Sequence, residues 1–184
     1  MTNTTITLDQ PTASGPPAAN LRNPGASVVV GIVNVADYQQ RNFDTKEPEF
    51  WDDGKPKMGK VITGIVVTAT DTTCGTDDAA PPAAPGDLVT FWCEKGKHFT
   101  WRDAVRAHGA VSPGDVMRWE RLEDEPPARR GMHPQKVYKA TLRAPEARDG
   151  DLPERCVAAY YDAQQRPVVD APAAAAAPAV GDVF

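Results

Sequence analysis

The sequence predicts an all-β fold with one short helix inside it and a flexible segment at each end. Five separate runs are rich in β-branched and aromatic residues, and one short stretch between them has helical signals. Low-complexity sequence rich in proline, glycine and alanine gathers near the two ends and in one loop. We therefore expect a folded domain over residues 22–145, a flexible arm over 1–21 and a flexible acidic tail over 146–184.

The first two strands are predicted at Val28–Tyr38 and Lys57–Thr70, and each contains an internal glycine. A glycine inside a strand, such as Gly31, is typical of a bend or bulge in a strongly coiled strand. The polar connection at residues 39–57 carries aromatic residues and an Asp-Gly turn signal. These two strands are expected to form a long hairpin with a substantial aromatic loop.

The remaining elements follow a long irregular loop expected at residues 71–87. Three further strands are predicted, at Leu88–Cys93, Val116–Leu122 and Lys136–Arg143. A short helix is predicted at Trp101–His108, with Thr100 as its N-cap and Gly109 as its stop. Residues 152–162 fit a short helix or a strand equally well.

Five strands with a helix between the third and the fourth are the arrangement of the OB-fold, a five-stranded Greek-key barrel that binds single strands and oligosaccharides. The sequence thus predicts a five-stranded OB-fold barrel. Trp119 and Trp101 are expected to pack inside it. Phe91 and Trp92 are neighbours in one strand and point to opposite faces, so only one of them can belong to the core.

The net charge of −5 argues against a protein that coats DNA by charge alone. Residues 22–145 nevertheless hold equal numbers of basic and acidic side chains, and the excess acidity lies in the two ends. A neutral barrel can carry a basic groove on one face.

Three widely spaced cysteines predict no disulfide framework and favour a reducing compartment. Neither a zinc-ligand spacing nor a catalytic motif is present, so we expect no metal, no cofactor and no enzymatic activity. The polar N-terminus predicts no signal peptide, and no apolar run is long enough for a membrane helix. A cytoplasmic protein without membrane contact is expected.

Binding to a single strand needs flat side chains that stack on bases and cations that follow the phosphates. The candidate stacking residues are Tyr38, Phe50, Trp51 and Trp92. The candidate phosphate contacts are Lys55, Lys57, Lys60, Lys97, Arg118 and Lys139. A solvated strand start is the alternative interpretation of the three lysines at residues 55–60.

Three stretches resemble a known family in their order and spacing. They are Asn42–Thr63 (NFDTKEPEFWDDGKPKMGKVIT), Ala104–Val116 (AVRAHGAVSPGDV) and Lys136–Ala140 (KVYKA). They resemble single-stranded-DNA-binding proteins encoded by phages and prophages of actinobacteria, over roughly residues 25–145. The resemblance implies an OB-fold that binds single-stranded DNA with little sequence preference in replication or recombination, without catalytic residues or a cofactor. For a phage protein, the compartment would be the host cytoplasm.

Bacterial single-stranded-DNA-binding proteins commonly end in a flexible linker and an acidic tip that docks partner enzymes. By that resemblance, Asp182, Val183 and Phe184 would dock replication or recombination proteins after an Ala/Pro-rich linker. A disordered end is the alternative. A homo-oligomer formed through edge strands is also plausible for an OB-fold.

Two other functions stay open at this stage. The first is an OB-like protein-interaction or adaptor module that does not bind nucleic acid, which the net charge and the neutral central region favour. The second, weaker one is a metal-dependent nuclease that uses acidic pairs in loops, at residues 52–53 and 77–78.

Overall fold

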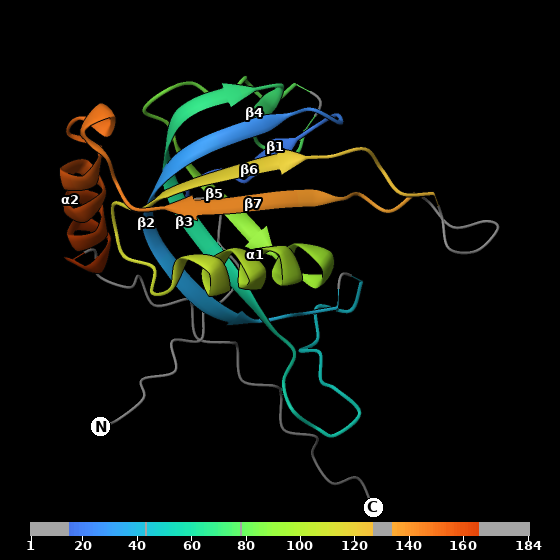
Figure 1. The fold of residues 1–184 in the computed structure, drawn as a ribbon. Coiled ribbons are helices and arrows are strands. Elements are labelled where there is room, and N and C mark those ends of the chain that lie inside the picture. The colour runs from blue at the N-terminus through green and yellow to red at the C-terminus, as the bar shows by residue number, and fades with distance from the viewer. Residues whose placement is uncertain (1–14, 43, 78, 127–133, 166–184) are drawn as a thin grey trace, which may run out of the picture.

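The computed structural model describes residues 15–42, 44–77, 79–126 and 134–165. Five strands form one antiparallel sheet in the order β5-β3-β2-β6-β7 (Figure 1). They are β2 (Ser27–Gln39), β3 (Met58–Thr70), β5 (Leu88–Cys93), β6 (Val116–Arg121) and β7 (Tyr138–Arg143). All five lie where the alternating sequence predicts them; the fold is mostly β with two helices, so the all-β prediction with one short helix is confirmed in part.

The long hairpin of β2 and β3 is bent where the interior glycine predicted it. The register between the two strands shifts at Val29/Val30 and again between Ile32 and Asn34, on either side of Gly31. Two irregularities so close together increase the local twist and curve the sheet strongly. This curvature lets one sheet surround most of its own core.

Helix α1 (Lys95–His108) lies between the third and fourth long strands, as expected, but begins six residues before the predicted start. Thr100 is therefore not the N-cap; its hydroxyl lies inside the helix, 3.2 Å from Gly96 O and 3.3 Å from Tyr138 O. Gly109 ends the helix as predicted, with φ of 101° and its N–H donating to Val105 O.

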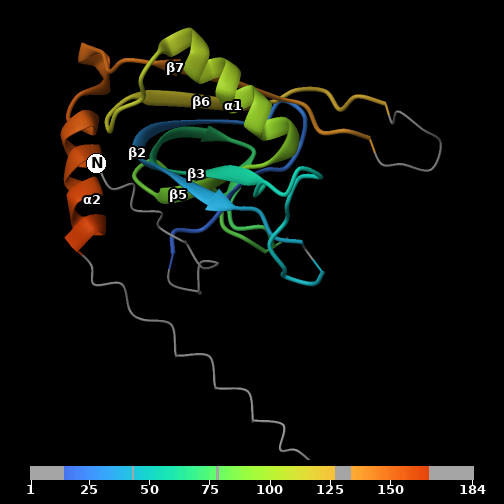
Figure 2. The same ribbon diagram turned by 90° about the horizontal axis from the view of Figure 1, so that it is seen from below.

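The sheet does not close into a barrel, and this part of the prediction is wrong. Among the described residues, the edge strands β5 and β7 do not pair with each other. Residues 16–18 run beside β5 instead: Thr90 N–H donates to Pro17 O at 2.9 Å, and Ala18 forms a parallel bridge with Thr90. Helix α1 contacts both β5 and β7 and runs along β7 (Figure 2). An N-terminal segment and a helix thus occupy the seam between the two edges.

A second, two-stranded sheet holds the N-terminal segment in place. It pairs β1 (Ala19–Leu21) with β4 (Thr72–Cys74), within the stretch expected to be an irregular loop. Arg121 is 5% exposed and fixes this segment, because its guanidinium donates to the carbonyls of Leu21 and Arg22. The same guanidinium forms a bidentate pair with Asp124 at 2.7 and 2.9 Å.

Large aromatic side chains fill the main core, as expected. Trp119 is 1% exposed and Trp101 is 4% exposed. Phe91 stacks on Trp119 with ring centroids 6.3 Å apart, whereas its neighbour Trp92 lies on the other face and is half-buried. The predicted division between Phe91 and Trp92 is confirmed.

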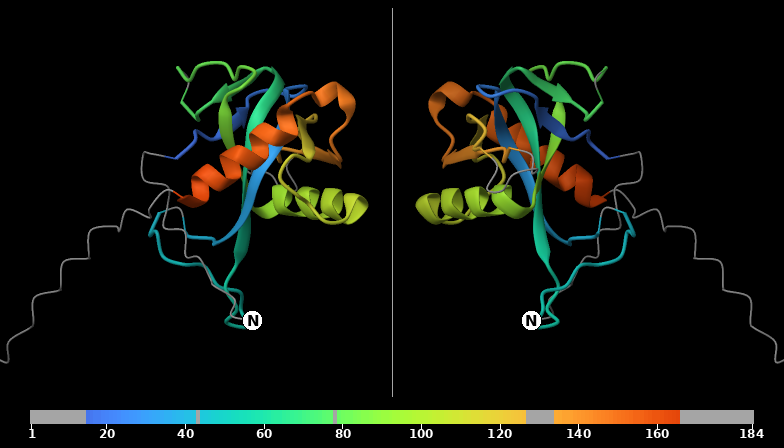
Figure 3. Two further views of the ribbon diagram at one scale, coloured as in Figure 1. Left: turned by 90° about the vertical axis from the view of Figure 1, so that its left-hand side faces the viewer. Right: turned by 90° about the vertical axis from the view of Figure 1, so that its right-hand side faces the viewer.

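The described fold extends beyond residues 22–145 at both ends. Besides β1, it includes a 3-10 turn (Ala147–Asp149) and helix α2 (Leu152–Gln165), which crosses β2 (Figure 3). Leu152 and Cys156 of α2 are buried in a second apolar cluster with Val33, Ile65 and Val116. Residues 146–165 are therefore part of the folded unit and not of a tail. No helix in the described residues is long and apolar enough to cross a membrane.

Candidate nucleic-acid interface

The loop that connects β2 and β3 has a backbone conformation defined by hydrogen bonds. Backbone hydrogen bonds continue the hairpin into it, from Gln40 N–H to Lys57 O and from Trp51 N–H to Lys55 O, both at 2.8 Å. Its tip turns at Gly54, whose φ of 79° is readily adopted only by glycine. The loop projects away from the sheet (Figure 1).

Two of the four candidate stacking residues lie exposed on this loop. Phe50 is 52% exposed and Trp51 is 59% exposed, although large apolar side chains normally gain free energy by burial. The Lys57 ammonium lies over the Trp51 ring, 5.2 Å from its centroid. A base stacked on this ring would therefore lie beside a cation.

The other two candidates, Tyr38 and Trp92, support each other. Their rings meet edge to face at 4.8 Å, and the Tyr38 hydroxyl donates to Glu94. Burial and the hydrogen bond to Glu94 both raise the pKa of Tyr38. Tyr38 is 7% exposed, so its predicted stacking on a base is corrected to a supporting contact beneath the half-buried Trp92.

Each of the three loop-side lysines has a carboxylate partner. Lys55 lies 2.7 Å from Asp53, Lys57 lies 3.5 Å from Glu49, and Lys60 lies 2.6 Å from Asp37. The pair with Lys55 also lowers the pKa of Asp53. Surface ion pairs of this kind contribute only about 0–1 kcal/mol, so a phosphate can compete for these lysines, but their charge is not free in the unbound protein.

The remaining predicted cations fall into two places. Arg118 and Lys139 come together on the outer face of β6 and β7, where they line a hollow of about 300 Å³ with Glu120 and Thr141. Arg118 pairs with Glu120 at 3.4 Å. Lys97 lies elsewhere, on α1, with its ammonium 4.7 Å from the centroid of the Tyr138 ring.

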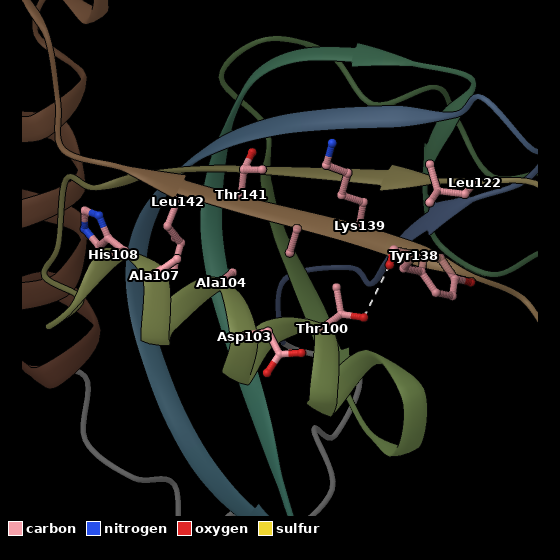
Figure 4. A pocket seen from close by; sticks show the side chains of 11 residues that line it. Thr100, Asp103, Ala104, Ala107, His108, Leu122, Tyr138, Lys139, Thr141 and Leu142 are labelled. Carbon is pink, nitrogen blue, oxygen red and sulfur yellow. Dashed lines mark hydrogen bonds between the residues drawn. The ribbon is translucent and has the colours of Figure 1, made fainter.

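A groove between α1 and β7, which the sequence did not indicate, lies beside the edge of the sheet (Figure 4). It has a volume of about 590 Å³, and residues from both faces of β7 line it, which places it along the strand's edge. Leu122 N–H donates to Val137 O, so alternate residues from Val137 onward face β6 and the backbone groups of Tyr138, Ala140 and Leu142 face the groove. This edge could not be recognised while β7 was expected to close a barrel.

Exposed Phe99 was also missed, because the predicted helix began after it. It is 54% exposed, and the Arg102 guanidinium lies 5.0 Å from its ring centroid.

The proposed docking residues Asp182, Val183 and Phe184 lie outside the described residues, as does Asp78 of one acidic pair. Within the described ranges, His, Cys, Asp and Glu side chains form no group of three that could hold a metal ion. No family model matches the chain, and neither do the curated proteins or the solved structures with which it was compared.

Proposed function

We propose that this protein binds single-stranded DNA with little sequence preference. The observation that carries the proposal is the ordered β2–β3 loop, which presents the exposed pair Phe50 and Trp51 with Lys57 against the Trp51 ring. Stacking on a flat ring beside a cation suits any base, because every base has a π-face. Such a protein would cover single strands exposed during replication or recombination.

The order of the strands supports the same proposal. A sheet ordered β5-β3-β2-β6-β7, with a helix between its third and fourth long strands, has the connectivity expected of an OB-fold opened along one seam. OB-folds bind single strands with the loop between their first two strands and the neighbouring sheet face. The β2–β3 loop holds that position in the chain.

The test uses a fluorescein-labelled dT15 oligonucleotide, with anisotropy for affinity and tryptophan quenching for location. Trp51 is far more exposed than the buried Trp101 and Trp119 and more exposed than the half-buried Trp92, so it should supply most of the quenching. Trp51→Ala should weaken binding by about 1–3 kcal/mol, or roughly 5- to 150-fold, without a change in melting temperature. Tyr161→Ala, at an equally exposed ring on α2, is the matched control and should bind as the wild type does.

The affinity for duplex DNA, measured in the same way, shows whether binding is specific for single strands. Binding of the single strand should weaken with salt by about 0.7 log units per tenfold rise for each phosphate contact. A wild-type chain that does not bind dT15 at low salt would refute the proposal. So would a folded Trp51→Ala variant with full affinity and full quenching.

The β7 edge favours a second candidate function, an interaction module for another protein. Ala140 and Leu142 direct their backbone groups into the groove, and within the described residues these groups have no hydrogen-bond partner. An extended peptide could pair with such an edge by strand addition. A chain that ignores all oligonucleotides but binds an extended peptide would favour this candidate.

A further inference from the structure

We propose that Lys97, whose ammonium lies over the ring of Tyr138, and Lys136 together form the site that holds a phosphate of the bound strand. This inference rests on the proposed function and deepens it. It assigns the principal phosphate contact to a position away from the lysines of the β2–β3 loop. Neither Lys136 nor Tyr138 is among the residues that the sequence suggested for binding.

The lysines of the loop and the lysines at this site differ in whether a carboxylate neutralises them. Lys55, Lys57 and Lys60 each have a carboxylate within 4 Å. In the part of the chain that the structure describes, Lys97 and Lys136 have no such partner. An incoming phosphate would displace a carboxylate from the loop lysines but would meet unneutralised charge at this pair.

The surroundings of Lys97 would favour a bound anion. Its stem is half-buried at the start of α1, and its ammonium lies 4.7 Å from the centroid of the Tyr138 ring. Burial lowers the pKa of Lys97, and the charge of Lys136 lowers it further. Cys93 and, less strongly, Glu94 oppose this shift, and the Glu94 carboxylate already accepts the Tyr38 hydroxyl. A phosphate between the two ammonium groups would remove their repulsion.

Backbone hydrogen bonds on both sides hold Lys136 in place. Its neighbour Gln135 exchanges two backbone hydrogen bonds with Glu125, at 2.9 and 3.0 Å, and Val137 O accepts from Leu122 N–H. Lys136 is therefore fixed on both sides by paired backbone, and its exposed side chain is free to turn toward a ligand. The amide of Gln135 lies near Gly96 on α1 and offers a neutral donor at the same place.

The experiment measures dT15 affinity by anisotropy across a range of salt concentrations for Lys97→Met and Lys136→Gln. Methionine keeps the alkyl stem of Lys97 against Tyr138, so that folding is preserved. Each variant should lose about fivefold in affinity at 0.1 M salt, and its salt slope should fall by about 0.7. Lys97→Arg keeps the charge and should keep the slope.

Arg148→Gln is the matched control, because this side chain is 68% exposed, is paired with Glu146 at 2.9 Å and lies on the 3-10 turn, outside both proposed contact regions. It should change affinity by less than about twofold and leave the slope unchanged. If Lys57→Gln, in the β2–β3 loop, lowers the slope and the two test variants do not, the inference is wrong while the proposed function stands. A wild-type protein that binds no oligonucleotide would instead refute the proposed function, and this site with it.

Discussion

Substitution of Gly31 by alanine should displace helix α2 from the sheet. A methyl group built on Gly31 would lie 2.7 Å from the Cys156 sulfur and 2.8 Å from two carbons of Leu152. Non-bonded carbon atoms prefer about 3.5–4.0 Å, so the helix would have to move away by roughly 1 Å. Leu152 and Cys156 are the two buried residues of α2, and both would lose their contact with the sheet.

The cost can be worked out from two opposing effects. Overpacking of a well-packed site costs about 1–3 kcal/mol. Replacing glycine by alanine returns about 0.4–1 kcal/mol, because the unfolded chain becomes less free. The two ranges give a net loss of at most about 2.6 kcal/mol, with a central value of about 1–2 kcal/mol, in the free energy of unfolding, which urea titration would measure. For a domain of this size, the melting temperature should fall by about 3–6 °C.

A thiol-labelling assay shows whether the helix has moved. Burial raises the pKa of Cys156 to about 11, so at pH 8 its thiol should react slowly in the wild type. Displacement of α2 would return that pKa toward its ordinary value and speed up the reaction. Cys93 is fully buried in the main core, with its pKa raised to about 12, and is the internal control.

A double variant tests the cause. Leu152→Ala removes two of the three atoms that the new methyl group would meet and leaves the Cys156 sulfur, so Gly31→Ala should cost at least about 0.5 kcal/mol less in that background. The reasoning would be refuted if Gly31→Ala left stability unchanged and Cys156 as unreactive as in the wild type. Strict additivity of the two substitutions would refute the steric explanation.

Three further predictions concern stability. The methyl group of Gly96→Ala would lie 3.8 Å from the nearest atom, which is an ordinary contact. Because alanine makes the unfolded chain less free, the substitution should stabilise the protein by about 0.4–1 kcal/mol. A lower free energy of unfolding in urea titration would contradict this. Arg121→Met leaves Asp124 and two carbonyls without their donor and should lower the free energy of unfolding by about 1.5–3 kcal/mol. Proteolysis near residues 15–25 should become faster. If the N-terminal segment stays as resistant as in the wild type, Arg121 does not hold it in place. Arg143 lowers the pKa of Asp149 to about 2, so this pair stabilises the fold above about pH 4 and loses its effect as pH falls through 2. Asp149→Asn should therefore reduce the fall in melting temperature between pH 5 and pH 2, and an unchanged fall would rule the pair out.

Local patterns predicted the elements whose identity depends on neighbouring residues. The five long strands were found because alternation and β-branched residues act over a few positions, and Gly109 ended its helix for an equally local reason. The start of α1 was missed because Gly96 is a poor helix former. Packing of Trp101 and contacts with β7 outweigh that preference in the folded protein.

The rest depends on partners far apart in the sequence. Nothing near Thr90 indicates that residues 16–18 will run beside it, and nothing near Gly31 indicates that α2 will cover it. The candidate site shows the same limit. Exposed Trp51 was found from its acidic, loop-like context, whereas the neutralisation of Lys60 by Asp37 follows from the register of two strands.

The seam between β5 and β7 has a consequence for how the chain is made. Leu21 and its neighbours leave the ribosome early, yet the arginine that binds their carbonyls follows 100 residues later. At about 5–20 residues per second, that interval lasts roughly 5–20 s. The strands beside this segment, β4 and β5, begin only 51 and 67 residues after Leu21, so for the first half of this interval it has no strand to pack against. Closing so large a loop carries an entropic cost, so docking of the N-terminal segment should come last in folding. This should hold both during synthesis on the ribosome and in refolding from denaturant.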